Sequence, residues 1–210
     1  MLARAGVASS RFLKAIELSN GKRQFWQYLI GAFNLYDSDR VKEVGPDRAA
    51  AEWLLKNGAS VRWQGHHEAL RDYNQIGISG GRYIEAIDCT GSSVSNRGFK
   101  HFDGLKHVRE VKLVNCWEVG DSAMRYMAEC IPDTLQHLDV ILCGVSDEGL
   151  LALRRVKGLK RYRIGNLPNV ENIEKVINQL KDELRQCQFE HITQVDESHK
   201  KKKSLFGLFK

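Results

Sequence analysis

The chain has 210 residues, of which 42% are hydrophobic and 28% charged, and its formal net charge is +6. That length can bury a sizeable core, and its five cysteines, none with Cys-x-x-Cys spacing, disfavour a zinc or dithiol redox site and favour a reducing compartment. The positive charge lies at the ends, because residues 1–20 carry +2 and residues 200–210 carry +5, which leaves −1 for the rest. Nucleic-acid binding therefore loses its main electrostatic support.

Residues 1–21 have the profile of a mitochondrial transit peptide. The segment is rich in Ala, Ser and Arg, and Arg11 and Lys14 interrupt its apolar residues. A secretory signal would need an unbroken apolar run instead. An ordinary amphipathic cap helix is the alternative. No stretch of the chain reaches the ~20 apolar residues of a membrane span, so we expect a soluble or peripheral protein.

A helical capping module is predicted over residues 22–80. Apolar and aromatic residues over 25–35 mark one helix. A second helix begins at Pro46, a residue favoured at the first helical position, and ends before Gly58 as a C-terminal cap. A short strand is expected over 61–63. The module would cover an open strand edge, which otherwise invites aggregation.

Residues 81–187 repeat one pattern. Each unit has apolar residues at its first, fourth and sixth positions, and the phrase Val-Ser-Asn-Arg-Gly-Phe returns as Val-Ser-Asp-Glu-Gly-Leu ahead of a helical run. The periods are 24, 27 and 24 residues between the first positions, which are Ile84, Val108, Leu135 and Leu159. Leucine-rich repeats have periods of roughly 20–29 residues. We therefore predict an α/β fold, a leucine-rich-repeat solenoid of about four repeats capped by the N-terminal helical module.

Alternation along each repeat strand predicts the exposed face of the sheet. The fourth and sixth positions point into the core, and the third, fifth and seventh line a concave face. This face is mixed in charge, which suits a protein partner better than a nucleic acid. A solvated face without a partner is the alternative. The residues that we expect to bind a partner are Lys112, Asp139, Arg161 and Arg163.

Residues 188–210 form a basic C-terminal tail. Four lysines lead into Ser-Leu-Phe-Gly-Leu-Phe-Lys. Basic residues beside large apolar ones would suit a surface anchor on anionic lipid, at roughly 1 kcal/mol per lysine. A disordered solubilising tail is the alternative.

One stretch of the capping module resembles a known family. Residues 39–55 read Asp-Arg-Val-Lys-Glu-Val-Gly-Pro-Asp-Arg-Ala-Ala-Ala-Glu-Trp-Leu-Leu, and Gly58-Ala59 and Asp72-Tyr73-Asn74 follow. The chain from about residue 23 to 184 closely resembles the family of mitochondrial ATP synthase subunit s, also called coupling factor B. The string also recurs in outline in a paralogue implicated in assembling the distal membrane arm of respiratory complex I.

The resemblance implies a peripheral, matrix-side protein of the mitochondrial inner membrane. It would be a non-enzymatic accessory protein that binds ATP synthase subunits and supports proton-coupled ATP synthesis. Assembly of complex I, with its assembly intermediates as partners, is one alternative, and an F-box-type leucine-rich-repeat adaptor is another. The chain has no recognisable base, nucleophile or phosphate loop, which argues against an enzyme.

The resemblance also implies Mg²⁺ as a cofactor, held by Gly58 and Thr90. Mg²⁺ prefers oxygen ligands and usually keeps several waters, so two protein ligands would bind it weakly. The alternative is that Gly58 is a helix cap and Thr90 an ordinary strand residue. The family's Cys-x-Cys pair aligns with Val114 and Cys116, so a dithiol mechanism does not carry over, and Cys116 falls at a position expected to be buried.

Overall fold

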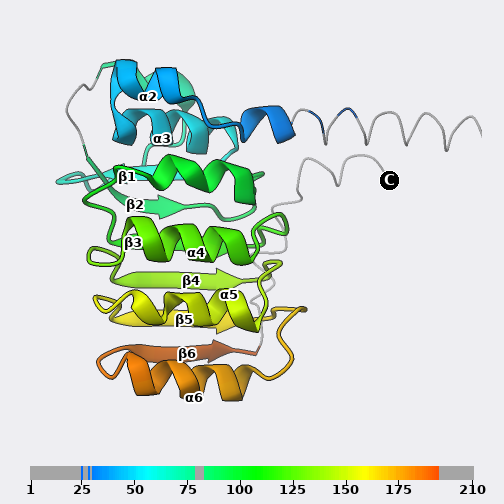
Figure 1. The fold of residues 1–210 in the computed structure, drawn as a ribbon. Coiled ribbons are helices and arrows are strands. Elements are labelled where there is room, and N and C mark those ends of the chain that lie inside the picture. Colours follow the sequence, from blue (N-terminus) through cyan, green and yellow to red (C-terminus); the bar gives the residue numbers. More distant parts are fainter. Residues whose placement is uncertain (1–24, 26–27, 29, 79–82, 194–210) are drawn as a thin grey trace, which may run out of the picture.

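The computed structural model describes residues 25, 28, 30–78 and 83–193 (Figure 1). The predicted transit segment and the lysine-rich end of the tail lie outside these residues. In the described part, strands β1 to β6 form one mixed sheet in sequence order, with β1 antiparallel to β2 and the others parallel. The strands are β1 (Ser60–Trp63), β2 (Ile84–Asp88), β3 (Glu110–Val114), β4 (His137–Ile141), β5 (Arg161–Gly165) and β6 (Gln188–Ile192).

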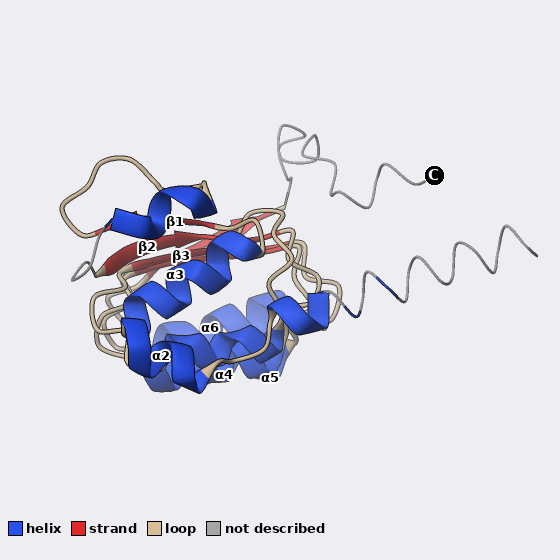
Figure 2. Ribbon diagram, turned by 90° about the horizontal axis from the view of Figure 1, so that it is seen from above, coloured by secondary structure: helices blue, strands red, loops and turns tan. Residues whose placement is uncertain are grey.

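Helices connect the strands, and α4, α5 and α6 cover one face of this sheet (Figure 2). The α-helices are α2 (Ser38–Val44), α3 (Pro46–Lys56), α4 (Asp121–Cys130), α5 (Asp147–Ala152) and α6 (Ile173–Glu183). The 3₁₀ helices are η1 (Tyr73–Ile78), η2 (Asn96–Phe102) and η3 (Leu153–Arg155). Figure 2 shows α4, α5 and α6 on the same side of the sheet, so its opposite side is free of α-helices along β3 to β5. The α/β class expected from the sequence is confirmed.

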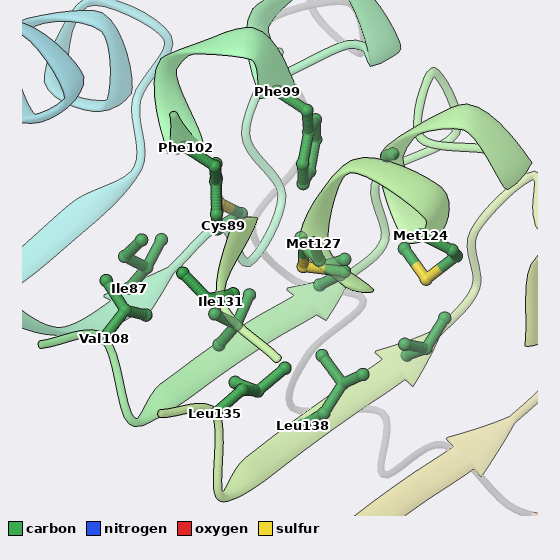
Figure 3. Close-up of a cluster of buried hydrophobic side chains, with 14 of the residues drawn as sticks. Ile87, Cys89, Phe99, Phe102, Val108, Met124, Met127, Ile131, Leu135 and Leu138 are labelled. Carbon is green, nitrogen blue, oxygen red and sulfur yellow. The ribbon is translucent and has the colours of Figure 1, made fainter. Parts of the chain in front are cut away.

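The core lies between the sheet and its helices. Inward-facing strand residues such as Ile87, Leu138 and Tyr162 are at most 1% exposed. Figure 3 shows how Phe102 of η2 and Met127 of α4 join strand residues in one apolar cluster. Burying each large apolar side chain contributes about 1.5–3 kcal/mol, and each layer gains this only by packing on its neighbours.

A residue with left-handed backbone follows each of the strands β2 to β5. The backbone φ angles are +65° at Gly91, +57° at Asn115, +53° at Leu142 and +49° at Asn166. Glycine and asparagine adopt this conformation at little cost, whereas leucine does not. The left-handed conformation therefore recurs because the repeated turn requires it, since even Leu142 adopts it.

The N-terminal module agrees with the sequence at its second helix and strand. Helix α3 begins at Pro46 and ends at a C-cap on Asn57, and Gly58 follows with φ +80°. Helix α2 was not predicted, because it buries none of its residues and so has no apolar periodicity. Instead, Asp37 caps it, and its Arg40 binds the buried Glu52 of α3 with Nη2 to Oε1 at 2.6 Å.

Strand β6 was also not predicted. Its fourth-position residue Phe189 lies in register with Tyr162, as the pattern requires. At the sixth position, however, β6 has the exposed His191 beside Ile164, so the apolar signal is lost. An edge strand needs less apolar surface than a central one, which explains the weaker pattern.

Tyr162→Phe should stabilise the protein. Tyr162 is 0% exposed, burial raises the pKa of its hydroxyl well above the usual value, and the hydroxyl has no hydrogen-bond partner among the described residues. Because an unpaired buried hydroxyl is costly, its removal should raise the free energy of unfolding by about 1 kcal/mol in urea denaturation. Tyr126→Phe, on the exposed side of α4, is the matched control and should change nothing. A loss of stability in the Tyr162 variant alone would contradict the prediction.

Candidate functional site

The sheet face opposite α4–α6, here called the open face, carries three rows of side chains. Each row runs across the strands, because parallel pairing sets equivalent positions side by side. The first row is Arg62, Ala86, Glu110, His137, Arg161 and Gln188. The second row is Ser60, Asp88, Lys112, Asp139, Arg163 and Glu190. The third row is Val114, Ile141, Gly165 and Ile192.

The second row alternates in charge from β2 to β6. Arg163 lies between two acids of this row, with Nη1 3.1 Å from Asp139 Oδ2 and Nε 3.2 Å from Glu190 Oε2. Asp139 is only 3% exposed. Burial raises the pKa of Asp139, and the positive charges of Arg163 and Lys112 partly offset that effect. Opposite charges on neighbouring strands stabilise the sheet and hold these side chains in place.

At the β1–β3 end of the first row, the charged side chains form ion pairs. Arg62 binds Glu85 and lies 3.7 Å from Glu110, measured from Nη2 to Oε2. Glu110 also receives Lys112, with Nζ 3.3 Å from Oε1. Arg109 adds a second, more exposed contact to Glu85. This end of the open face is therefore a closed network of acids and bases.

The third row is apolar and closely packed. Val114 and Ile141 are at most 7% exposed although they lie on the open face. A Cβ on Gly165 would come 2.3 Å from the Ile192 carbonyl oxygen, so only glycine fits beside β6. The open face thus combines fixed charges with a closely packed apolar row near the carboxyl ends of its strands.

The four predicted partner-binding residues all lie on the open face. Lys112, Asp139 and Arg163 are neighbours in the second row, and Arg161 is in the first row on the same strand as Arg163. The sequence periodicity located them correctly, although it could not predict that Asp139 would be buried. Their role in binding a partner stays a prediction.

Gly58 and Thr90 lie at the junction between the N-terminal module and the first repeat. Strands β1 and β2 pair Ser60 with Asp88 in antiparallel register, so Gly58, just before β1, and Thr90, just after β2, lie at the same end of this strand pair. Gly58 is exposed, and a Cβ there would meet nothing within 4 Å, so the space beside it is open. Asp88 Oδ1 accepts the Thr90 amide at 2.9 Å. No group of three or more His, Cys, Asp or Glu side chains in the described part could hold a metal ion.

The oxygen atoms at this junction match the preferences of Mg²⁺ in kind. The residues offer backbone carbonyls and one hydroxyl, with open space for water around Gly58. The chemistry of the donors therefore fits a hydrated magnesium ion, and its presence stays a prediction.

Asn34 connects the same junction from the inside, and sequence reasoning missed it. This side chain is 0% exposed. Its Nδ2 donates to Asn57 Oδ1 and Ser93 O, both at 3.0 Å, and its Oδ1 accepts Trp53 Nε1 and the Ser95 amide. One amide thus links the N-terminal helical residues, α3 and the loop after β2. In the sequence, Asn34 is visible only as a polar residue within an apolar run. That position does not predict which groups its side chain would bind.

The thiols behave as core residues. Cys116 Sγ donates to the Cys89 carbonyl oxygen at 2.8 Å, and both residues are 1% exposed. Burial raises the pKa of Cys89 well above the usual value. A hydrogen bond with Cys143 lowers the pKa of Cys116, but burial limits access to its sulfur. The expectation of a buried Cys116 is confirmed.

A small cleft of about 380 Å³ lies beside the same junction, away from the open face. It is lined by Ile30, Gly31, Ser95, Asn96, Arg97 and Glu118. Asn96 Oδ1 in its wall accepts the Gly120 amide at 2.8 Å and so is engaged in joining two repeats. The cleft is therefore secondary to the open face as a candidate site.

Fold and surface together define an α/β protein built of one mixed sheet, with helices on one face and a charged, partly apolar surface on the other. No family model matches the chain. It is 43% identical over 167 residues to the rat protein named ATP synthase subunit s, mitochondrial, which covers 77% of this chain and 84% of the relative. The human and bovine proteins of that name are each 37% identical over 177 residues, covering 82% of this chain and 88% of the relatives. The chain belongs to the family of mitochondrial ATP synthase subunit s.

Asn34→Ala should destabilise the protein strongly. It would leave the Trp53 indole N–H and the Ser95 amide without their acceptor in a buried site, at an expected cost of about 3 kcal/mol. Urea denaturation of the full chain would measure this loss. The adjacent Leu35, 60% exposed, offers a control in Leu35→Ala, which should change the free energy of unfolding by less than about 0.5 kcal/mol. Equal effects of the two substitutions would show that the Asn34 network does not hold the junction together.

Proposed function

We propose that this protein is a non-enzymatic accessory protein of mitochondrial ATP synthase that binds the complex through its open face. The main support is membership of the family whose rat, human and bovine members are named ATP synthase subunit s, mitochondrial. The names of these relatives favour ATP synthase over complex I assembly intermediates and over an F-box-type adaptor. A peripheral position on the matrix side of the inner membrane is part of the proposal.

The repeated units belong, in this proposal, to a leucine-rich-repeat solenoid. The support is the return of a strand, a left-handed turn and a helix at the period read from the sequence. In such a stack the sheet face is rigid, because every strand is fixed by its neighbours. A rigid face loses little conformational entropy on binding, which favours docking by preformed side chains.

Binding through the open face needs no chemical step by this protein. Lys112, Asp139 and Arg163 are held by the sheet register and their ion pairs, so they present a fixed pattern of charge. A partner with the complementary pattern would bind in one orientation. Docked in this way, the protein would support proton-coupled ATP synthesis by holding subunits of the complex in place.

Contact with the membrane is the second part of the proposal. No helix in the described ranges has both the length and the apolar character needed to cross a membrane. The lysine-rich tail, which lies outside those ranges, would supply a surface contact with anionic lipid.

Mg²⁺ would be held between Gly58 and Thr90, with waters completing its coordination. When bound, it would act as a structural link between the N-terminal module and the first repeat. The Asn34 hydrogen bonds already join these parts from the inside, so the ion would add stability on the solvent side.

Affinity purification from mitochondria tests the proposed function. The tagged full chain should recover ATP synthase subunits, and Lys112→Glu should reduce that recovery at least fivefold by reversing a charge on the open face. Lys181→Glu on α6, an equally large charge change on the helical side, should have no effect. Recovery of complex I intermediates without ATP synthase would refute the assignment.

Titration calorimetry with Mg²⁺ tests the metal proposal. The purified protein should bind Mg²⁺ at millimolar concentration, and Mg²⁺ should raise the melting temperature by mass action. Gly58→Pro should abolish both effects, because proline cannot adopt the φ of +80° that Gly58 has. Gly65→Pro, at φ +78° outside the junction, controls for backbone disruption. If the unaltered protein shows no heat of binding at millimolar Mg²⁺, the metal proposal should be dropped.

A further inference from the structure

Arg161 differs from the other arginines and lysine of the open face in its pairing. Arg62, Arg163 and Lys112 each lie within ion-pair distance of a carboxylate on the same face. The side chain of Arg161 makes no ion pair or hydrogen bond to any described residue of the chain. On β5, next to the last strand, the first row therefore carries a positive charge that no described residue pairs.

The sheet register explains why Arg161 lacks a partner. Its neighbours across the sheet are His137 on β4 and Gln188 on β6, and neither carries a carboxylate. The nearest acids lie one row away. Asp139 and Glu190 both bind Arg163, so Arg161 acts on Asp139 only through its charge.

The Arg161 guanidinium is also partly withdrawn from solvent. Its Nε is buried and has no hydrogen-bond partner in the described part of the protein. A buried donor without an acceptor is unfavourable, and a carboxylate that accepts from a guanidinium forms a short, two-bonded pair. An acid bound at the guanidinium would pair with a charge that the described residues leave unpaired.

We propose that Arg161 anchors the open face to its partner by binding a carboxylate of an acidic protein segment. This inference rests on the proposed function and specifies the chemistry of the partner surface.

Charge complementarity favours a protein carboxylate over a lipid surface. A bilayer presents many anionic groups in a plane, and the acids of the second row would repel them. A second copy of this chain is the other competitor. Asp88, the open-face acid without an ion pair in the described residues, could supply the carboxylate, but its Oδ1 already accepts the Thr90 amide.

Binding to purified, detergent-solubilised mitochondrial ATP synthase tests the proposal. Arg161→Gln should weaken the affinity of the full chain at least tenfold, and Arg161→Lys should retain part of it because the charge remains without the planar fork. Arg155→Gln, an exposed arginine of η3 outside the open face, is the matched control and should stay within twofold. Equal affinity of Arg161→Gln and the unaltered chain would overturn the anchor and leave the proposed function standing.

A second measurement tests whether Arg161 binds a carboxylate, and it does so even if the protein does not bind ATP synthase. The Arg161 Nε–H resonance, identified by its loss in Arg161→Gln, should shift in NMR spectra when hexaglutamate is added. The absence of a shift would overturn the anchor, while failure of the unaltered chain to bind ATP synthase would overturn the proposed function alone.

Substitutions at Arg161 and Asp88 also distinguish the alternative binding partners of Arg161. Loss of cardiolipin-vesicle binding in Arg161→Gln would assign the site to lipid. A dimer in sedimentation that both Arg161→Gln and Asp88→Asn abolish would assign it to a second copy. If the Arg161 Nε–H resonance of a chain that ends at Thr193 differs from that of the full chain, the carboxylate that binds Arg161 belongs to the chain's own tail. Each of these results would overturn the proposal.

Discussion

In-register parallel pairing from β2 to β6 is the constraint on which the rest of the structure depends. It sets each position of one strand beside the same position of the next, so a property repeated in the sequence becomes a continuous row in space. Apolar positions form the shared core under the helices. The left-handed turn recurs at the end of each strand from β2 to β5, even where it is occupied by Leu142. A slip of one residue would turn the core side of a strand toward solvent.

The same pairing organises the charges of the open face. Acids and bases alternate along the second row, and Arg163 bridges two acids on its neighbouring strands. These ion pairs are partly screened from solvent, since Asp139 is buried, so they are held more firmly than exposed surface pairs. Because Arg163 takes both nearby acids, Arg161 is left without one. Most charges of the open face are thus paired with one another, and among the described residues the Arg161 charge on β5 is left without an acid.

The junction with the N-terminal module follows a different principle. There the chain is joined by a few specific polar contacts, centred on the buried amide of Asn34. Antiparallel pairing of β1 with β2 places Gly58 and Thr90 at the same end of the strand pair. Such contacts have a defined geometry, whereas apolar packing is less directional. They therefore fix the module in one orientation on the first repeat.

The repeat period by itself determined the positions of β2 to β5, their inward residues and the sheet face that carries the candidate site. Helix α3 was equally predictable, because Pro46 and Gly58 mark its ends. Helix α2 and strand β6 lack apolar periodicity, so only tertiary contacts decided them. The tertiary structure alone also decided the burial of Asp139, the partners of Asn34 and the isolation of Arg161. Periodicity specifies which residues share a row, but pairing within and between rows depends on distances that only the packed sheet establishes.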